Sequence, residues 1–161
     1  MEEKSVVLLL GSNMGDSQAC LKIAIRHLEQ HLSSIIMTSS VYKTAAWGKT
    51  NQADFYNQVL VFKSQFSAEY ILNICLDVEK QMGRERIEKW AERVIDIDIL
   101  FYGNVVIDEP NLKVPHPYLH VRMFTLVPLN EIMPQFIHPV FNKTIDKLLD
   151  NCSDTSKVEK M

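Results

Sequence analysis

Alternating side-chain character predicts a β-strand over residues 93–102. β-branched and aromatic residues dominate this segment, and such residues favour extended structure. Alternate side chains of a strand share a face, so one apolar face is expected to hold Ile95, Ile97, Ile99 and Phe101. Asp96 and Asp98 would then point to the opposite face, about 7 Å apart along the strand.

These two aspartates allow two interpretations. Aspartate is uncommon in strands, and two carboxylates held this close repel each other, so a bound cation would relieve the repulsion. Carboxylate oxygens suit a hard cation such as Mg²⁺. Alternatively, the strand has one face open to water and both carboxylates are simply solvated. The strand alone does not decide between a metal site and a solvated surface.

Hydrophobic patterning predicts further elements before this strand. A continuous apolar run at 6–10 predicts a strand buried on both faces, and an amphipathic helix follows over 16–32. Two strands are expected at 35–42 and 55–63, then a helix at 67–82. This order of strands and helices fits a split βαβ arrangement. We therefore expect a four-stranded antiparallel sheet with both helices on one face and a loop-built cleft, facing the aspartates, on the other.

Composition narrows the class of protein. The chain has 161 residues, 47% of them hydrophobic and 23% charged, which predicts one soluble domain with a core. A formal net charge of −3 argues against a nucleic-acid binder that acts through bulk positive charge. Cys20, Cys75 and Cys152 lack metal-ligand spacing, and the N-terminus resembles neither a signal peptide nor a membrane span, so we expect a cytoplasmic protein with reduced thiols.

Three features near the aspartate strand carry candidate chemistry. Glu79 falls on the apolar face of the 67–82 helix, where a carboxylate is costly unless it is paired, binds a ligand or reaches solvent at the boundary. The segment 83–93 holds four basic residues and a tryptophan, consistent with a phosphate-binding lid or with a solvated charged surface. His116 stands between two prolines, which would present it rigidly.

The last part of the chain has weaker signals. Short helical stretches are expected at 122–131, where Pro128 interrupts the pattern, and at 144–149. The segment 151–161 is polar and is expected to fray.

Several motifs in this order resemble one known family. They are Gly11-Ser12-Asn13, the 93–100 strand with its two aspartates, Val114-Pro115-His116-Pro117, and the Arg-x-Phe-x-Leu-x-Pro-Leu run at 122–129. Gly-Ser-Asn alone is weak, but the last three in succession are highly specific. Over about residues 7–148 the chain resembles the 6-hydroxymethyl-7,8-dihydropterin pyrophosphokinases of folate biosynthesis.

The resemblance implies a ferredoxin-like α+β fold and a single reaction. The terminal two phosphates of ATP would move as a unit to the hydroxymethyl oxygen of the dihydropterin, leaving AMP. Asp96 and Asp98 match ligands of two Mg²⁺ ions, and the residues expected to act in catalysis are Arg84, Arg93, Asp96 and Asp98. Two metal ions can clamp both the phosphate chain and the attacking oxygen.

The resemblance also implies two sets of substrate-binding residues. The pterin would contact Thr44, Ala45, Ala46, Trp47, Phe55, Asn57 and Phe124. ATP would contact Glu79, Arg84, Lys89, Trp90, Arg93, Ile99, His116 and Arg122. One departure concerns the predicted lid, where Ala91 and Glu92 stand in place of the usual Gly-Pro, and this is expected to change how the lid closes.

We accordingly expect a single pyrophosphokinase domain over residues 1–150, a polar tail over 151–161, and a monomer that binds neither nucleic acid nor membrane. Two other classes compete. A non-catalytic ferredoxin-like ligand-binding module gives no reason for the aspartates, His116 and the arginines to occur together. A two-metal nuclease or nucleotidyl transferase would use the same carboxylates, but it would need a basic nucleic-acid face.

Overall fold

The computed structural model describes residues 2–45, 54–83 and 94–161. In these ranges the strands are β1 Lys4–Ser12, β2 Ile35–Thr38, β3 Tyr42–Thr44, β4 Phe55–Ser64, β5 Asp96–Tyr102, β6 Ile107–Glu109, β7 Leu112–Val114 and β8 Val158–Lys160. The helices are α1 Ser17–His31, α2 Ala68–Gln81, α3 Met123–Ile132 and α4 Ile145–Asp150, with a 3₁₀ turn, η1, at Leu119–Val121. Across the described ranges, none of the helices has the length and apolar character needed to cross a membrane.

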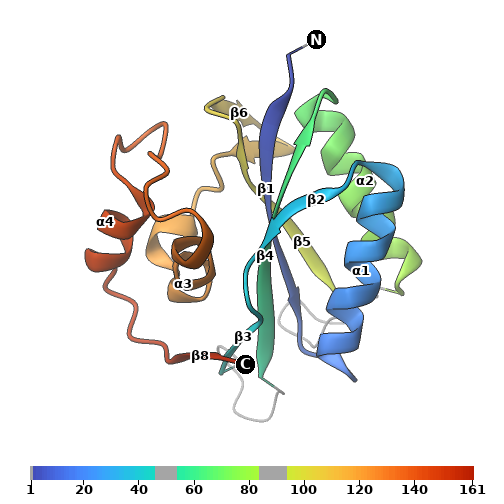
Figure 1. Cartoon of the computed structure of the whole chain (residues 1–161), viewed down its shortest axis with the longest axis horizontal. Coiled ribbons are helices and arrows are strands. Elements are labelled where there is room, and N and C mark those ends of the chain that lie inside the picture. The colour runs from blue at the N-terminus through green and yellow to red at the C-terminus, as the bar shows by residue number, and fades with distance from the viewer. Residues whose placement is uncertain (1, 46–53, 84–93) are drawn as a thin grey trace.

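An antiparallel sheet forms the centre of the protein (Figure 1). Its strand order is β5-β1-β4-β3-β8, and β2 pairs with the same edge of β4 as β3 does. The succession β1, α1, β2 and β3, β4, α2, β5 is the predicted one, and it confirms the ferredoxin-like α+β class. The strand expected at 35–42 is divided into β2 and β3, because the Ser39 hydroxyl accepts the Val59 backbone N–H at 2.9 Å.

Helices cover both faces of this sheet. α1 and α2 pack on the face that carries Leu8 and Phe62, as the sequence predicted. α3 and α4 pack on the opposite face, which carries Val7, Leu9 and Val59, and Figure 1 shows the two helix pairs on opposite sides. The sequence predicted these later helices but assigned them to no face, so the cleft side of the sheet is less open than expected. Burial of alternating β1 residues on both faces confirms that strand as the central one.

The alternation predicted for β5 holds over only part of the strand. Ile97 and Ile99 pack on the α1–α2 side as expected, but Phe101 belongs to the core on the opposite side. The pairing of β5 with β1 shifts register after Ile99, which leaves Leu100 as an extra residue. A bulge of this kind reverses the faces of the residues beyond it, so the prediction for Phe101 was wrong.

The expectation that the C-terminal segment frays was also wrong. β8 pairs antiparallel with β3, so that Val158 lies opposite Thr44 and Lys160 lies opposite Tyr42. The backbone N–H of Met161 donates to the carbonyl of Val41 at 2.9 Å, which extends the pairing to the last residue. Hydrogen bonding to a strand edge orders this polar segment without a large apolar contribution from its own side chains.

Candidate active site

The candidate site lies where the central strand β1 ends. Gly11 is opposite Asn57 of β4 on one side and opposite Asp96 of β5 on the other. Directly opposed residues in antiparallel strands share a face, and adjacent strands lie about 4.8 Å apart. Asn57 and Asp96 therefore flank Gly11 on one face of the sheet, with their backbones roughly 10 Å apart. Asp98 is opposite Leu9, so both aspartates lie on the face that α3 covers.

Gly11 is needed at this position because of its neighbour. A Cβ atom at Gly11 would lie 2.7 Å from Oδ1 of Asn57, closer than non-bonded atoms approach. The Asn57 side chain thus extends over the glycine, and the residue is 4% exposed. Because Gly11 has no side chain, the Asn57 amide can lie over it, on the same face of the sheet as Asp96.

A second polar group lies in the adjoining strand pair. Thr44 of β3 is opposite Phe55 of β4, and Thr44 is 2% exposed. Among the described residues, its Oγ1 atom has no hydrogen-bond partner. A buried oxygen of this kind is costly without a partner, so it fits a site whose ligand brings hydrogen-bonding groups. Ala45, the next residue, is exposed.

The two aromatic residues predicted for pterin stacking come from different elements. Phe55 begins β4 and Phe124 lies in the first turn of α3, and both are half-buried. Phe124 packs against the core between α3 and the sheet. The described residues include no ring contact between Phe55 and Phe124, so the two are not stacked on each other.

Glu79 has a structural partner that the sequence did not reveal. Its side chain is buried, with 4% exposed, and Oε2 accepts the backbone N–H of Ile97 at 2.7 Å. β5 is an edge strand of the sheet, so this carboxylate satisfies a backbone donor at that edge. The bond explains why a carboxylate is tolerated on the apolar face of α2, and the predicted contact with ATP stays a prediction.

Asp96 and Asp98 of β5 are the candidate metal ligands among the described residues. Burial raises the pKa of the Cys75 thiol, and the nearby carboxylates of Glu79 and Asp98 raise it further. Cys75 is therefore protonated at neutral pH. The described residues contain no group of three or more His, Cys, Asp or Glu side chains placed to hold a metal. Asp96 and Asp98 alone fit Mg²⁺, which proteins often bind through one or two carboxylates together with substrate phosphates.

A cavity of about 270 Å³ adjoins Asp98. It lies between β5, α2 and the β6–β7 hairpin, and it brings together three residues of the predicted site, Asp98, Ile99 and His116. Its other lining residues are Leu72, Ile97, Pro110, Asn111, Leu112, Lys113 and Pro117. An apolar wall with a few convergent polar groups is typical of a small-ligand site.

His116 is held as a neutral hydrogen-bonding group. Its backbone N–H donates to the carbonyl of Leu100 at 3.0 Å, and its Nδ1 accepts the backbone N–H of Tyr118 at 3.1 Å. Because Nδ1 is an acceptor, the proton of the neutral ring resides on Nε2. Burial, together with the positive charge of Arg122, lowers the pKa of His116 to about 4. At neutral pH His116 is therefore an uncharged donor beside the cavity.

Arg122 is oriented by aromatic rings. Its guanidinium carbon lies 5.2 Å from the centre of the Tyr118 ring and 5.5 Å from that of Phe124. Cation–π contacts at these distances limit the rotamers of the arginine while leaving its N–H groups able to donate. The His116 ring also contacts the Tyr118 ring, with 6.1 Å between ring centres, so both predicted phosphate-binding residues border the same tyrosine.

Six residues of the predicted site lie outside the described ranges. They are Ala46, Trp47, Arg84, Lys89, Trp90 and Arg93. Conversely, sequence reasoning missed Gly11 as the spacer beneath Asn57, Leu72 on α2, and the hairpin residues 110–113 that line the cavity. The Pro110-Asn111 pair signals a turn, but no local pattern places that turn against β5.

Comparison with known proteins gives a consistent family. The family model described as 7,8-dihydro-6-hydroxymethylpterin-pyrophosphokinase (HPPK) matches residues 7–134. A protein of Aquifex aeolicus (strain VF5) named 2-amino-4-hydroxy-6-hydroxymethyldihydropteridine pyrophosphokinase is 45% identical over 141 residues, which is 88% of each chain. A protein of the same name from Methylorubrum extorquens is 35% identical over 153 residues, covering 94% of this chain and 95% of the relative.

A solved structure supports the fold. The wild-type HPPK-DHPS of Plasmodium falciparum, crystallised with pteroate, aligns with a TM-score of 0.75 at 19% identity over 92% of this chain. The present chain spans only 44% of that longer chain, so this likeness concerns one part of it. The two sequence relatives, unlike this structure, match this chain over most of their own length as well as most of its length. The chain belongs to the 7,8-dihydro-6-hydroxymethylpterin-pyrophosphokinase (HPPK) family.

Proposed function

We propose that the protein transfers the terminal diphosphate of ATP to 6-hydroxymethyl-7,8-dihydropterin across the face that joins Asn57, Gly11 and Asp96. This is the pyrophosphokinase reaction of folate biosynthesis, and membership of the HPPK family supports it. The observation that supports the location is the register of β1, in which the buried Asn57 and the proposed metal ligand Asp96 lie on either side of Gly11. The hydroxymethyl group of the pterin and the phosphate chain of ATP could then lie side by side.

In this proposal the pterin lies at the Asn57 end of the site. The buried amide of Asn57 and the Thr44 hydroxyl, which has no hydrogen-bond partner among the described residues, offer hydrogen bonds to the edge of the heterocycle. Phe55 and Phe124, from two different elements, would stack on its two faces, since flat rings favour offset stacking. Three more residues, Ala45, Ala46 and Trp47, complete the predicted pterin segment.

ATP is proposed to occupy the cavity beside Asp98. Ile99 belongs to its apolar wall, and His116 offers an uncharged N–H donor. Arg122 would contribute positive charge to the phosphates from its position against the Tyr118 and Phe124 rings. The resemblance adds Arg84, Lys89, Trp90 and Arg93 from the predicted lid.

Asp96 and Asp98 are the proposed ligands of two Mg²⁺ ions. When bound, Mg²⁺ would neutralise phosphate charge and hold the reacting groups in line. The hydroxymethyl oxygen then forms a bond to the β-phosphorus of ATP as the bond from that phosphorus to the α–β bridging oxygen breaks. AMP leaves with that oxygen, and the hydroxyl proton passes to solvent. The arginines stabilise the charge that develops on the phosphates.

We further propose one pyrophosphokinase domain over residues 1–150, followed by the segment 151–161, and a cytoplasmic monomer. One central sheet with helices on both faces, joined by the small β6–β7 hairpin, supports one domain. The three cysteines are unpaired with one another, which suits a reducing compartment.

Product analysis tests the proposed reaction. Purified protein with Mg²⁺, ATP and 6-hydroxymethyl-7,8-dihydropterin is expected to form AMP and pterin diphosphate in equal amounts. The control omits the pterin and should give background AMP. Formation of ADP in place of AMP, or AMP that does not depend on the pterin, would refute the assignment.

A further inference from the structure

The start of α3 is completed by a residue from far along the chain. The first N–H groups of a helix have no partners within it, and Arg122, at the N-cap, makes no side-chain capping bond. Instead, the backbone N–H of Met123 donates to Oδ2 of Asp154 at 2.9 Å. This carboxylate therefore fixes the helix turn that carries Arg122 and Phe124.

Asp154 is itself held in a defined orientation. Its other oxygen, Oδ1, accepts the backbone N–H of Ser156 at 2.9 Å and the Ser156 hydroxyl at 2.6 Å. Burial alone would raise the pKa of the Asp154 carboxyl, but its hydrogen bonds to Ser156 and Met123 outweigh burial, so the pKa is lowered. An ionised carboxylate at a helix N-terminus is also favoured by the helix dipole.

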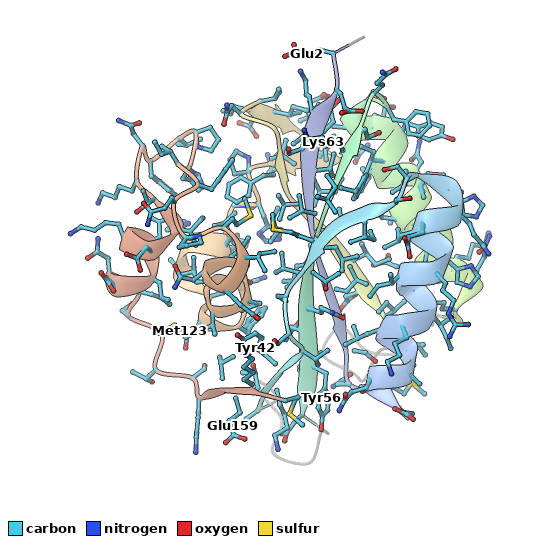
Figure 2. The ribbon with its side chains drawn as sticks, viewed as in Figure 1. Glu2, Tyr42, Tyr56, Lys63, Met123 and Glu159 are labelled. Carbon is cyan, nitrogen blue, oxygen red and sulfur yellow. The ribbon has the colours of Figure 1, made fainter. Side chains whose placement is uncertain are left out.

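Beyond Ser156 the chain continues to the edge of the sheet. β8 pairs with β3, so that Val158 lies opposite Thr44. Figure 1 shows this segment passing from α4 along one end of α3 to β3. In Figure 2 the labelled Met123, Tyr42 and Glu159 lie at this same end of the molecule. We name residues 153–161 the C-terminal strap.

A separate set of bonds joins the other end of α3 to β3. The Glu131 carboxylate accepts the backbone N–H of Ser40 at 2.8 Å, the Ser40 hydroxyl at 2.9 Å and the Tyr42 hydroxyl at 2.9 Å. Lys160 of the strap adds an ion pair with Glu131 at 3.8 Å. The strap and Glu131 thus connect α3 and β3 at two points.

We propose that the C-terminal strap sets the spacing between Phe124 on α3 and Thr44 on β3, and that Asp154 is a positioning residue for pterin binding. The proposal rests on the pterin site proposed above. The strap lies beyond residues 7–134, the part of the chain that the family model matches. It contacts α3 and β3, whereas the cavity proposed for ATP is formed by β5, α2 and the β6–β7 hairpin. Loss of the strap should therefore affect the pterin more than ATP.

The first test replaces Asp154 with alanine. Removing a helix cap costs about 1 kcal/mol, so the KM for the pterin should rise about fivefold if that loss appears in binding. The KM for ATP should change less, because the Tyr118 ring still supports Arg122. Asp154→Asn keeps an oxygen that can accept the Met123 N–H and should restore most of the pterin affinity. The matched control is Asp150→Ala, which removes an exposed carboxylate four residues earlier.

The second test acts on β8 and does not depend on Asp154. Met161 donates its N–H to Val41, and hydrogen-bonded pairs alternate along an antiparallel ladder, so the Glu159 N–H faces the Lys43 carbonyl. Glu159→Pro removes that donor, whereas Glu159→Ala removes only the 3.8 Å and 3.2 Å ion pairs with Lys43 and Lys157. We expect the proline variant alone to raise the KM for the pterin.

The outcomes separate this proposal from the proposed function. If the wild-type protein forms no pterin-dependent AMP, the proposed function fails. If it does, but Asp154→Ala and Glu159→Pro both keep the wild-type KM for the pterin, the strap proposal is wrong. Equal increases in KM for the pterin and for ATP would also refute it, since they would indicate general loss of structure.

Discussion

Replacing Gly11 with alanine probes the centre of the proposed site with one added methyl group. The new Cβ would lie 2.7 Å from Oδ1 of Asn57 and 3.7 Å from its Cγ. The Gly11 backbone does not have a positive φ, so alanine is compatible with the main chain and only the contact with Asn57 is unfavourable. Because Asn57 is buried, its amide can yield only by disturbing its surroundings.

Two effects of different size follow. Overpacking in a filled site costs about 1–3 kcal/mol of folding free energy. If the amide moves to relieve the contact, the pterin loses one hydrogen bond worth about 0.5–1.5 kcal/mol. That loss corresponds to an increase in the pterin KM of roughly two- to twelvefold.

A double-mutant cycle isolates the contact with Asn57. Urea denaturation would compare Gly11→Ala in the wild-type protein and in the Asn57→Ala variant, where the oxygen is absent. In the second background the alanine should be neutral or should stabilise by up to about 1 kcal/mol, because it restricts the unfolded chain. Pterin and ATP KM values for Gly11→Ala alone would show whether the effect is confined to the pterin.

The reasoning would be refuted by either of two results. One is the same loss of folding stability in both backgrounds, which would mean that Asn57 Oδ1 is not the atom that meets the new methyl group. The other is a stability loss in the wild-type background without any change in the pterin KM, which would separate Asn57 from the substrate.

Two further predictions concern buried ionisable groups. Glu79→Ala should lower the free energy of unfolding by about 1–3 kcal/mol, because the Ile97 N–H loses its acceptor. Glu79→Gln keeps an acceptor oxygen, so its free energy of unfolding should fall less. Equal urea midpoints for the two variants would contradict this prediction. Burial, together with the neighbouring His120, lowers the pKa of His138 from 6.5 to about 4. Between these two pH values the unfolded chain binds more protons than the folded protein. The free energy of unfolding should therefore decrease as the pH falls from 6.5 to about 4. His138→Asn should flatten the pH dependence of the urea midpoint, and the same replacement at exposed His31 should leave it unchanged.

Much of the fold could be predicted because its elements have strong local patterns. The apolar run of β1 and the amphipathic spacing of α1 and α2 gave the strand and helix order directly. The aspartates of β5 stood out for the same reason, since two carboxylates within an apolar strand contradict its local preference. The position of Asp96 next to Gly11, and across it from Asn57, depends on the register of three strands, which no local pattern specifies.

The features that sequence reasoning missed depend on distant partners. Phe101 changes face because of a bulge at Leu100, and a bulge inserts one residue without altering the residue types around it. β8 is short and polar, so only its pairing with β3 orders it. Glu79 stood out as a carboxylate on an apolar face, but the backbone N–H of β5 that it accepts lies 18 residues away, so no local pattern showed this bond.

The central claim is that the Asp98 end of the site performs the phosphoryl chemistry while the Asn57 end binds the pterin. Asp98→Ala tests it most directly, with AMP formation and pterin affinity measured on the same preparation. We expect turnover to fall by about a thousandfold or more, the effect of removing a metal ligand in the transition state. The pterin dissociation constant and the urea midpoint should remain near those of the wild-type protein. Turnover within tenfold of the wild-type rate would contradict the claim.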